Sequence, residues 1–182
     1  PIGSFLIDIG DLNSRNQERA NEVLANTSLP ISNLTDMPQV ATHELDLPRL
    51  GVYQTWTSTQ NAGWVRYSLD EADVPYTLFS KDRARRGNLQ RDFDVILIPH
   101  MGSGTSLASI MGGIDPKWSP LPYENSNATP NLGHILSSDD ITGGMGFEGM
   151  AAFEEFIREG GTLVTLGSAG VIATDSGILR GV

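Results

Sequence analysis

Ser168 and His100 are the two residues whose type and position could support nucleophilic chemistry. Ser168 directly follows an apolar run, in the position where many α/β enzymes carry a nucleophile. His100 follows a second apolar run, and a histidine at that point could act as a general base or bind a ligand. Both runs are expected to be parallel strands, so the two side chains should lie at the same edge of a sheet.

Each of these residues also has a structural interpretation. Leu166-Gly167-Ser168-Ala169-Gly170 matches the hydrolase pattern Gly-x-Ser-x-Gly only in part, because Leu166 replaces the first glycine. Ser168 could instead cap the backbone N–H groups of a following helical turn. Pro99 and Gly102 flank His100 closely, which is typical of a strand-ending turn. The pattern favours these structural roles over catalysis.

A binding crevice without chemistry is a further hypothesis. Gln54 and Trp56 follow another expected strand, and hydroxyl residues 55–59 beside the indole would suit a peptide or a sugar. Gly144 lies in a glycine-rich turn that could hold an anion, although the Lys-Ser/Thr element of a phosphate loop is missing. We expect Gln54, Trp56, His100, Gly144 and Ser168 to line one crevice. Trp56 could equally pack beneath a long loop, and Trp64 is expected in the core.

The composition limits the chemistry. The 182 residues include no cysteine, which excludes disulfides, thiolate catalysis and thiolate zinc sites. The three histidines, His43, His100 and His134, have no glutamate at the spacing of a His-x-x-Glu zinc pair. We therefore predict no metal site and no cofactor in this chain.

The charge excludes several partners. Twelve basic against 22 acidic residues give a net charge of −10, which disfavours nucleic acid and anionic membranes. The basic cluster of Lys81, Arg83, Arg85 and Arg86 is expected to form a solvated helix face. No apolar run is long enough to span a bilayer, and no secretory signal heads the chain. Because the chain starts at Pro1, we expect it to be a segment of a longer protein.

The elements that position these residues alternate between strand and helix. We treat 1–182 as a single domain with five parts. They are a strand-helix-strand unit (1–34), a connector (35–48), a β-α-β-α-β unit (49–99), a long loop insertion (100–146), and a helix, strand and elbow (147–182). Strands 4–9 and 27–34, helix 82–91 and a buried central strand 93–99 are specific expectations. Such alternation predicts an α/β fold with a doubly wound, mostly parallel sheet.

Residues 50–173 also resemble a known family. The distinctive pieces, in chain order, are Tyr53-Gln54-Thr55-Trp56, Gly63-Trp64, Gly87-Asn88-Leu89, Thr142-Gly143-Gly144-Met145-Gly146 and the elbow at Ser168. Together they resemble the class I glutamine amidotransferase-like domain that follows the catalytic domain in bacterial zinc carboxypeptidases of the carboxypeptidase A class. The resemblance implies a flavodoxin-like three-layer sandwich, with Ser168 at the position of the amidotransferase cysteine.

The resemblance implies a non-catalytic accessory domain, with zinc and proteolysis belonging to a peptidase domain of the same chain. A peptide substrate is a further implied partner, and the implied location is extracellular or periplasmic. Two alternatives stay open. One is a serine-type hydrolase that uses Ser168 and His100, and the other is a non-catalytic small-ligand or peptide-binding domain.

Overall fold

The computed structural model describes residues 5–10, 12–28, 30–36, 38–41 and 47–179. The chain divides into two compact units, residues 1–45 and 46–182. The division lies inside the expected connector 35–48. Each unit is described separately below.

The first unit contains the helix α1 (Ser14–Asn26). Asn13 caps its N-terminus, because the side-chain Oδ1 accepts the backbone N–H of Asn16 at 3.0 Å. The structure differs from the expected strands at 4–9 and 27–34, whose described residues form no strand. An apolar run forms a stable strand only with partner strands, and exposed Phe5 and Ile7 have none among the described residues.

The second unit is built on an all-parallel sheet of four strands. These are β1 (Leu50–Tyr53), β2 (Tyr76–Phe79), β3 (Val95–Ile98) and β4 (Thr162–Thr165), in the spatial order β2-β1-β3-β4. The chain moves outward in one direction from β1 to β2 and in the other from β3 to β4. The strand order therefore reverses between β1 and β3, where ligands commonly bind in such sheets.

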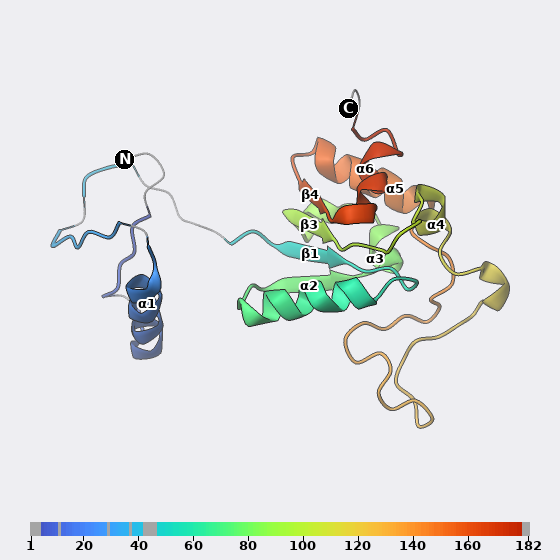
Figure 1. Cartoon of the computed structure of the whole chain (residues 1–182), viewed down its shortest axis with the longest axis horizontal. Helices are drawn as coiled ribbons and strands as arrows, with labels where there is room; N and C mark the ends of the chain where they lie inside the picture. Colours follow the sequence, from blue (N-terminus) through green and yellow to red (C-terminus); the bar gives the residue numbers. More distant parts are fainter. Residues whose placement is uncertain (1–4, 11, 29, 37, 42–46, 180–182) are drawn as a thin grey trace. The chain divides into compact units, whose positions relative to one another are not determined.

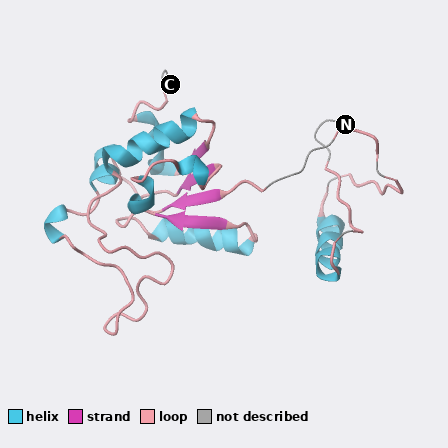
Figure 2. Cartoon of the chain, turned by 180° about the vertical axis from the view of Figure 1, so that it is seen from behind, coloured by secondary structure: helices cyan, strands magenta, loops and turns pink. Residues whose placement is uncertain are grey.

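Helices cover both faces of this sheet. α2 (Gln60–Glu71) connects β1 to β2, and α5 (Gly146–Arg158) connects the long loop to β4. Because the two crossovers run in opposite directions, right-handed connections place these helices on opposite faces. α2 lies in front of the strands in Figure 1 and behind them in Figure 2. The fold is α/β and consistent with a doubly wound sheet.

The core lies between the sheet and α5. Phe153 of α5 is completely buried and makes an edge-to-face contact with Tyr53 of β1, with ring centroids 5.5 Å apart. Tyr53 also contacts Phe79, which stacks on Phe93 at 4.7 Å. These four rings join β1, β2 and the segment that leads into β3 to one helix, and Tyr53 and Phe79 are the last residues of their strands.

The loop 100–146 contains short helical elements, including α4 (Leu107–Gly112) and a 3-10 turn, η2 (Pro116–Trp118). Asp140 anchors it internally by accepting hydrogen bonds from the Ser119 hydroxyl and from the backbone N–H groups of Leu121 and Thr142. These bonds hold the pKa of Asp140 well below its ordinary value. Ser138 attaches the loop to the body by donating to Asp82 Oδ2 at 2.7 Å.

Two expectations about helices are wrong. Trp64 is 63% exposed rather than buried. At 100° per residue it lies about 200° around α2 from Ala62, the buried residue of this helix. The expected helix 82–91 is divided into α3 (Lys81–Ala84) and the 3-10 turn η1 (Leu89–Arg91), because Gly87 and Asn88 both have positive φ.

The basic cluster is only partly a solvated face. Arg85 and Arg86 are exposed, but Lys81 is 5% exposed. The guanidinium of Arg83 forms a salt bridge with Asp92 at 2.7 Å and donates to the carbonyls of Gly87 and Asn88. The break after α3 supplies these carbonyls, so an irregular turn, rather than solvent, surrounds the charge.

Candidate functional site

The expected crevice residues lie at the carboxyl ends of the strands, in two groups. His100 and Ser168 contact each other beyond β3 and β4. Trp56 and Gly144 line a separate pocket beyond β1. Gln54 is buried between these strand ends, 8% exposed, and its backbone N–H donates to Phe79. The structure therefore places His100 with Ser168 in one group and Trp56 with Gly144 in another.

His100 and Ser168 are joined by two hydrogen bonds. The backbone N–H of Ser168 donates to His100 Nδ1 at 3.1 Å, and Ser168 Oγ lies 3.2 Å from the same nitrogen. Since a backbone N–H can only donate, Nδ1 must be the acceptor and must carry no proton. The Ser168 hydroxyl therefore also donates to Nδ1, and the neutral imidazole carries its proton on Nε2.

The Ser168 hydroxyl also accepts a hydrogen bond, from Met101. Its backbone N–H donates to Ser168 Oγ at 3.1 Å, while its carbonyl accepts from the Ser58 hydroxyl at 2.9 Å. The two bonds tie the loops after β1, β3 and β4 together. Ser168 does not cap the turn in which it lies, η3 (Gly167–Gly170), which is followed by α6 (Val171–Thr174). The expected capping role is wrong, and the hydroxyl serves the neighbouring loop.

The turn before Ser168 requires glycine. Gly167 has a φ of +53°, and a Cβ there would lie 2.5 Å from His100 Nδ1. Ser168 itself is absent from the residues with positive φ. The left-handed conformation thus falls one residue before the serine, which brings its backbone N–H onto the imidazole. This arrangement resembles a strand-to-helix elbow in position, but the hydroxyl carries no backbone strain.

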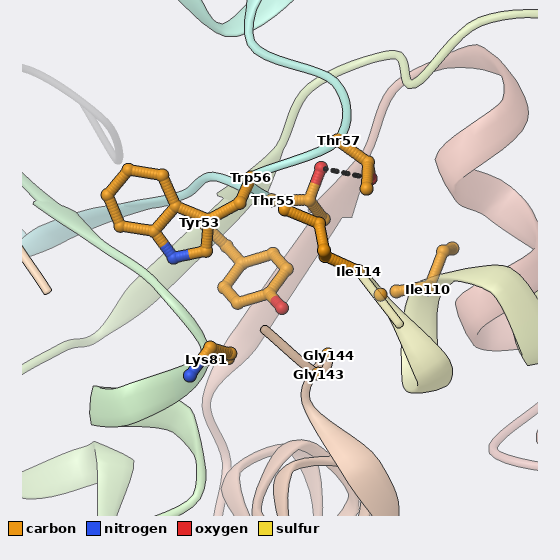
Figure 3. A pocket seen from close by; sticks show the side chains of 10 residues that line it. Tyr53, Thr55, Trp56, Thr57, Lys81, Ile110, Ile114, Gly143 and Gly144 are labelled. Atoms are coloured by element: carbon orange, nitrogen blue, oxygen red, sulfur yellow. Dashed lines mark hydrogen bonds between the residues drawn. The ribbon is translucent and has the colours of Figure 1, made fainter. Parts of the chain in front are cut away.

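The second group forms a narrow pocket (Figure 3). Its walls come from Tyr53 and the following residues 55–57, from Lys81 at the start of α3, from Ile110 and residues 113–114, and from Gly143 and Gly144. Gly144 lets the glycine turn approach α4 closely, since a Cβ there would meet the Ile110 carbonyl at 2.2 Å. The cavity volume is about 10 Å³, the space of roughly one water molecule.

Lys81 is a buried cation that sequence reasoning missed. Its ammonium forms a salt bridge with Asp82 at 2.8 Å, and its side chain is 6% exposed. Burial alone would raise the pKa of Asp82, but hydrogen bonds from Lys81 and Ser138 and the charges of Lys81 and Arg85 outweigh it and lower that pKa. The position of Lys81 in the sequence was a usable signal. It is the second residue after β2, at the edge of the sheet where ligands commonly bind.

Tyr53 and Trp56 bring further donors to this pocket. Burial raises the pKa of the Tyr53 phenol, which therefore stays neutral. In Figure 3 its hydroxyl points toward the glycine turn. The Trp56 ring packs on Tyr123 of the long loop, with centroids 5.0 Å apart, and its Nε1 is buried without a hydrogen-bond partner. Trp56 thus combines both expected roles, packing under the loop and lining a pocket.

Within the described ranges, the structure brings no three histidine or acidic residues together as a metal site would require. None of the helices in those ranges is long and apolar enough to cross a membrane.

Comparisons with known proteins identify no relative. No family model, no curated protein and no solved structure matches the chain.

Proposed function

We propose that this chain is a non-catalytic amidotransferase-like module of a zinc carboxypeptidase, with a flavodoxin-like build. The motif order across residues 50–173 supports the family, and the strand order β2-β1-β3-β4 agrees with the first four strands of that architecture. Proteolysis, its zinc and an extracellular or periplasmic location would belong to the whole protein. Fold-level resemblance alone does not carry function, so the proposal rests on the chemistry of the elbow.

The observation that carries the proposal is the way Ser168 is held. Its hydroxyl accepts from Met101 and donates to a nitrogen that already accepts a backbone N–H. No carboxylate among the described residues hydrogen-bonds to His100, so nothing there orients or stabilises an imidazolium. Under this proposal, the position that would hold the cysteine of an active amidotransferase instead links two loops in this chain.

Exposed apolar side chains support a role in contacts with another domain. Trp118 and Ile135 in the long loop and Phe147 at the start of α5 are 62%, 64% and 82% exposed. Trp64 and Tyr67 form an exposed edge-to-face pair on α2, with centroids 6.1 Å apart. Aromatic residues at the surface are enriched in interfaces. We propose the peptidase domain of the same chain as the partner and a peptide as its substrate.

A serine hydrolase is the second candidate, and the 3.2 Å contact between Ser168 Oγ and His100 Nδ1 favours it. A fluorophosphonate probe and a glutaminase assay test both candidates together. The non-catalytic proposal expects no labelling and no ammonia release. Labelling that S168A abolishes, in a variant that still folds, would establish the hydrolase instead. The T57S variant is the control for handling of a substituted protein, because Thr57 Oγ1 donates to the Thr55 hydroxyl and, within the described ranges, has no hydrogen bond to Ser168 or His100.

The peptidase context has its own test. The reading frame that encodes this chain is expected to encode a His-x-x-Glu motif and a later histidine as zinc ligands. Purified whole protein should contain zinc and release C-terminal residues from peptides, and H100A should retain that activity. A reading frame without such ligands would refute the accessory role while leaving the conclusion about the elbow intact.

A further inference from the structure

The buried pocket beside Lys81 is lined by two residues whose N–H donors have spare hydrogen-bonding capacity. The Lys81 ammonium has three N–H groups, and its assigned partner is one oxygen of Asp82. The Trp56 indole N–H has no partner although it is buried. A buried polar group left without a partner is costly, so each such group in a folded protein calls for a specific explanation.

The charges around the pocket also favour a ligand that accepts hydrogen bonds. The residues that line it include one cation, Lys81, and no acidic side chain. Asp82 faces the ammonium from outside the lining, and its second oxygen accepts the Ser138 hydroxyl. The guanidinium of Arg85 lies close to the glycine turn, since a Cβ on Gly143 would be 3.0 Å from its Nη2. One cation therefore lines the pocket and a second lies next to one of its lining residues, while the carboxylate of Asp82 is already engaged.

The size and the donor types distinguish the possible occupants. A water molecule fits the volume of about 10 Å³ but brings two protons that need acceptors. A carboxylate oxygen also fits, needs no acceptor, and compensates the charge of the ammonium. The remainder of such a ligand would extend toward solvent beside Thr57, the exposed residue of the pocket wall.

We infer that this pocket is a carboxylate-binding site, in which one oxygen of a small carboxylate ligand accepts from Lys81 and from Trp56 Nε1. Tyr53, held neutral by its burial, offers a third donor from the floor. The inference is independent of the peptidase context, since it concerns side chains within the second unit alone.

Nuclear magnetic resonance of the Trp56 indole N–H provides the test. Trp64 and Trp118 are 63% and 62% exposed, so W64F/W118F removes both with little effect on the core and leaves a single indole signal. Acetate titrated to about 100 mM at constant ionic strength should shift that signal saturably, with a dissociation constant in the millimolar range expected of so small a ligand. Acetamide, which has the same shape without the charge, should not.

Substitutions of two lysines then show whether the acetate-induced shift depends on Lys81. In the same single-tryptophan background, K81M should weaken acetate binding at least tenfold. K117M serves as the matched control, because Lys117 is 62% exposed and pairs with Asp115 outside the pocket. Absence of a saturable shift overturns the inference whether or not K81M folds, and leaves an ordered water as the occupant. Equal shifts with acetamide, or equal loss in K117M, also overturn it.

Discussion

Gly167 and His100 are so close that no side chain fits between them: a Cβ on Gly167 would lie 2.5 Å from the imidazole Nδ1. This approach aligns the following backbone N–H with the ring. The close approach of Gly167 to His100 therefore fixes the conformation of the turn. The position of Ser168 follows from it, because the Ser168 N–H donates to the imidazole.

Substituting this glycine should be costly. G167A combines a positive φ with the contact to His100, and we expect it to lower the free energy of unfolding by about 2–4 kcal/mol. Urea unfolding measures the loss. Gly104 is the matched control, because its φ is +79° but a Cβ there meets nothing within 4 Å. G104A should lose only about 1 kcal/mol. Equal losses would show that the His100 contact contributes nothing.

The bond between Met101 and Ser168 predicts a local effect. S168A leaves the Met101 N–H without its acceptor, so stability should fall by about 1 kcal/mol and exchange of that amide with deuterium should accelerate. S58A removes the bond to the Met101 carbonyl instead. It should leave exchange of the amide unchanged, and faster exchange in S58A would contradict the assignment.

The ion pair of Asp94 and Arg49 predicts that the free energy of unfolding depends on pH in the acidic range. Asp94 accepts the side chain and the backbone N–H of Arg49, which lowers its pKa from 3.8 to about 2. The unfolded chain therefore takes up this proton first as pH falls. The contribution of Asp94 is complete above about pH 4 and lost as pH falls toward 2.

Unfolding experiments from pH 5 to pH 2 can measure this window. The difference in unfolding free energy between the unsubstituted chain and D94N should shrink as pH falls. In an R49Q background, D94N should show a much smaller dependence. A difference that stays constant with pH would contradict the role of the pair.

Removal of two aromatic side chains, one buried and one exposed, should lower stability by very different amounts. F153A empties the centre of the core beneath Tyr53 and should cost about 3–5 kcal/mol in urea unfolding. W64A removes an exposed ring whose neighbour is Tyr67, and it should cost about 0.5 kcal/mol or less. A large loss of unfolding free energy in W64A would mean that Trp64 is buried, as the sequence pattern predicts, and would contradict the exposed position in the structure.

The sequence predicts the frame of the second unit because its signals are local. Apolar runs such as 95–98 form strands where expected, and their carboxyl ends locate His100 and Ser168. Trp64 was misplaced because a spacing of one residue moves a side chain about 100° around a helix. In contrast, the Met101–Ser168 bond joins groups 67 residues apart and involves a backbone atom that no side-chain pattern encodes.

Lys81 was missed for a different reason. A lysine next to an aspartate and three arginines has the composition of a solvated surface, and composition does not register which of these charges the fold encloses. The strand order decides it, because β2 delivers Lys81 beside the end of β1. For Lys81, the position directly after a strand is a better indicator of burial than the residue type.

Asp82 has one oxygen on Lys81 and the other on Ser138 of the long loop. Detaching the loop would free the second oxygen to compete for the remaining ammonium protons. The hydrogen bond from Ser138 therefore keeps one oxygen of Asp82 away from the enclosed lysine.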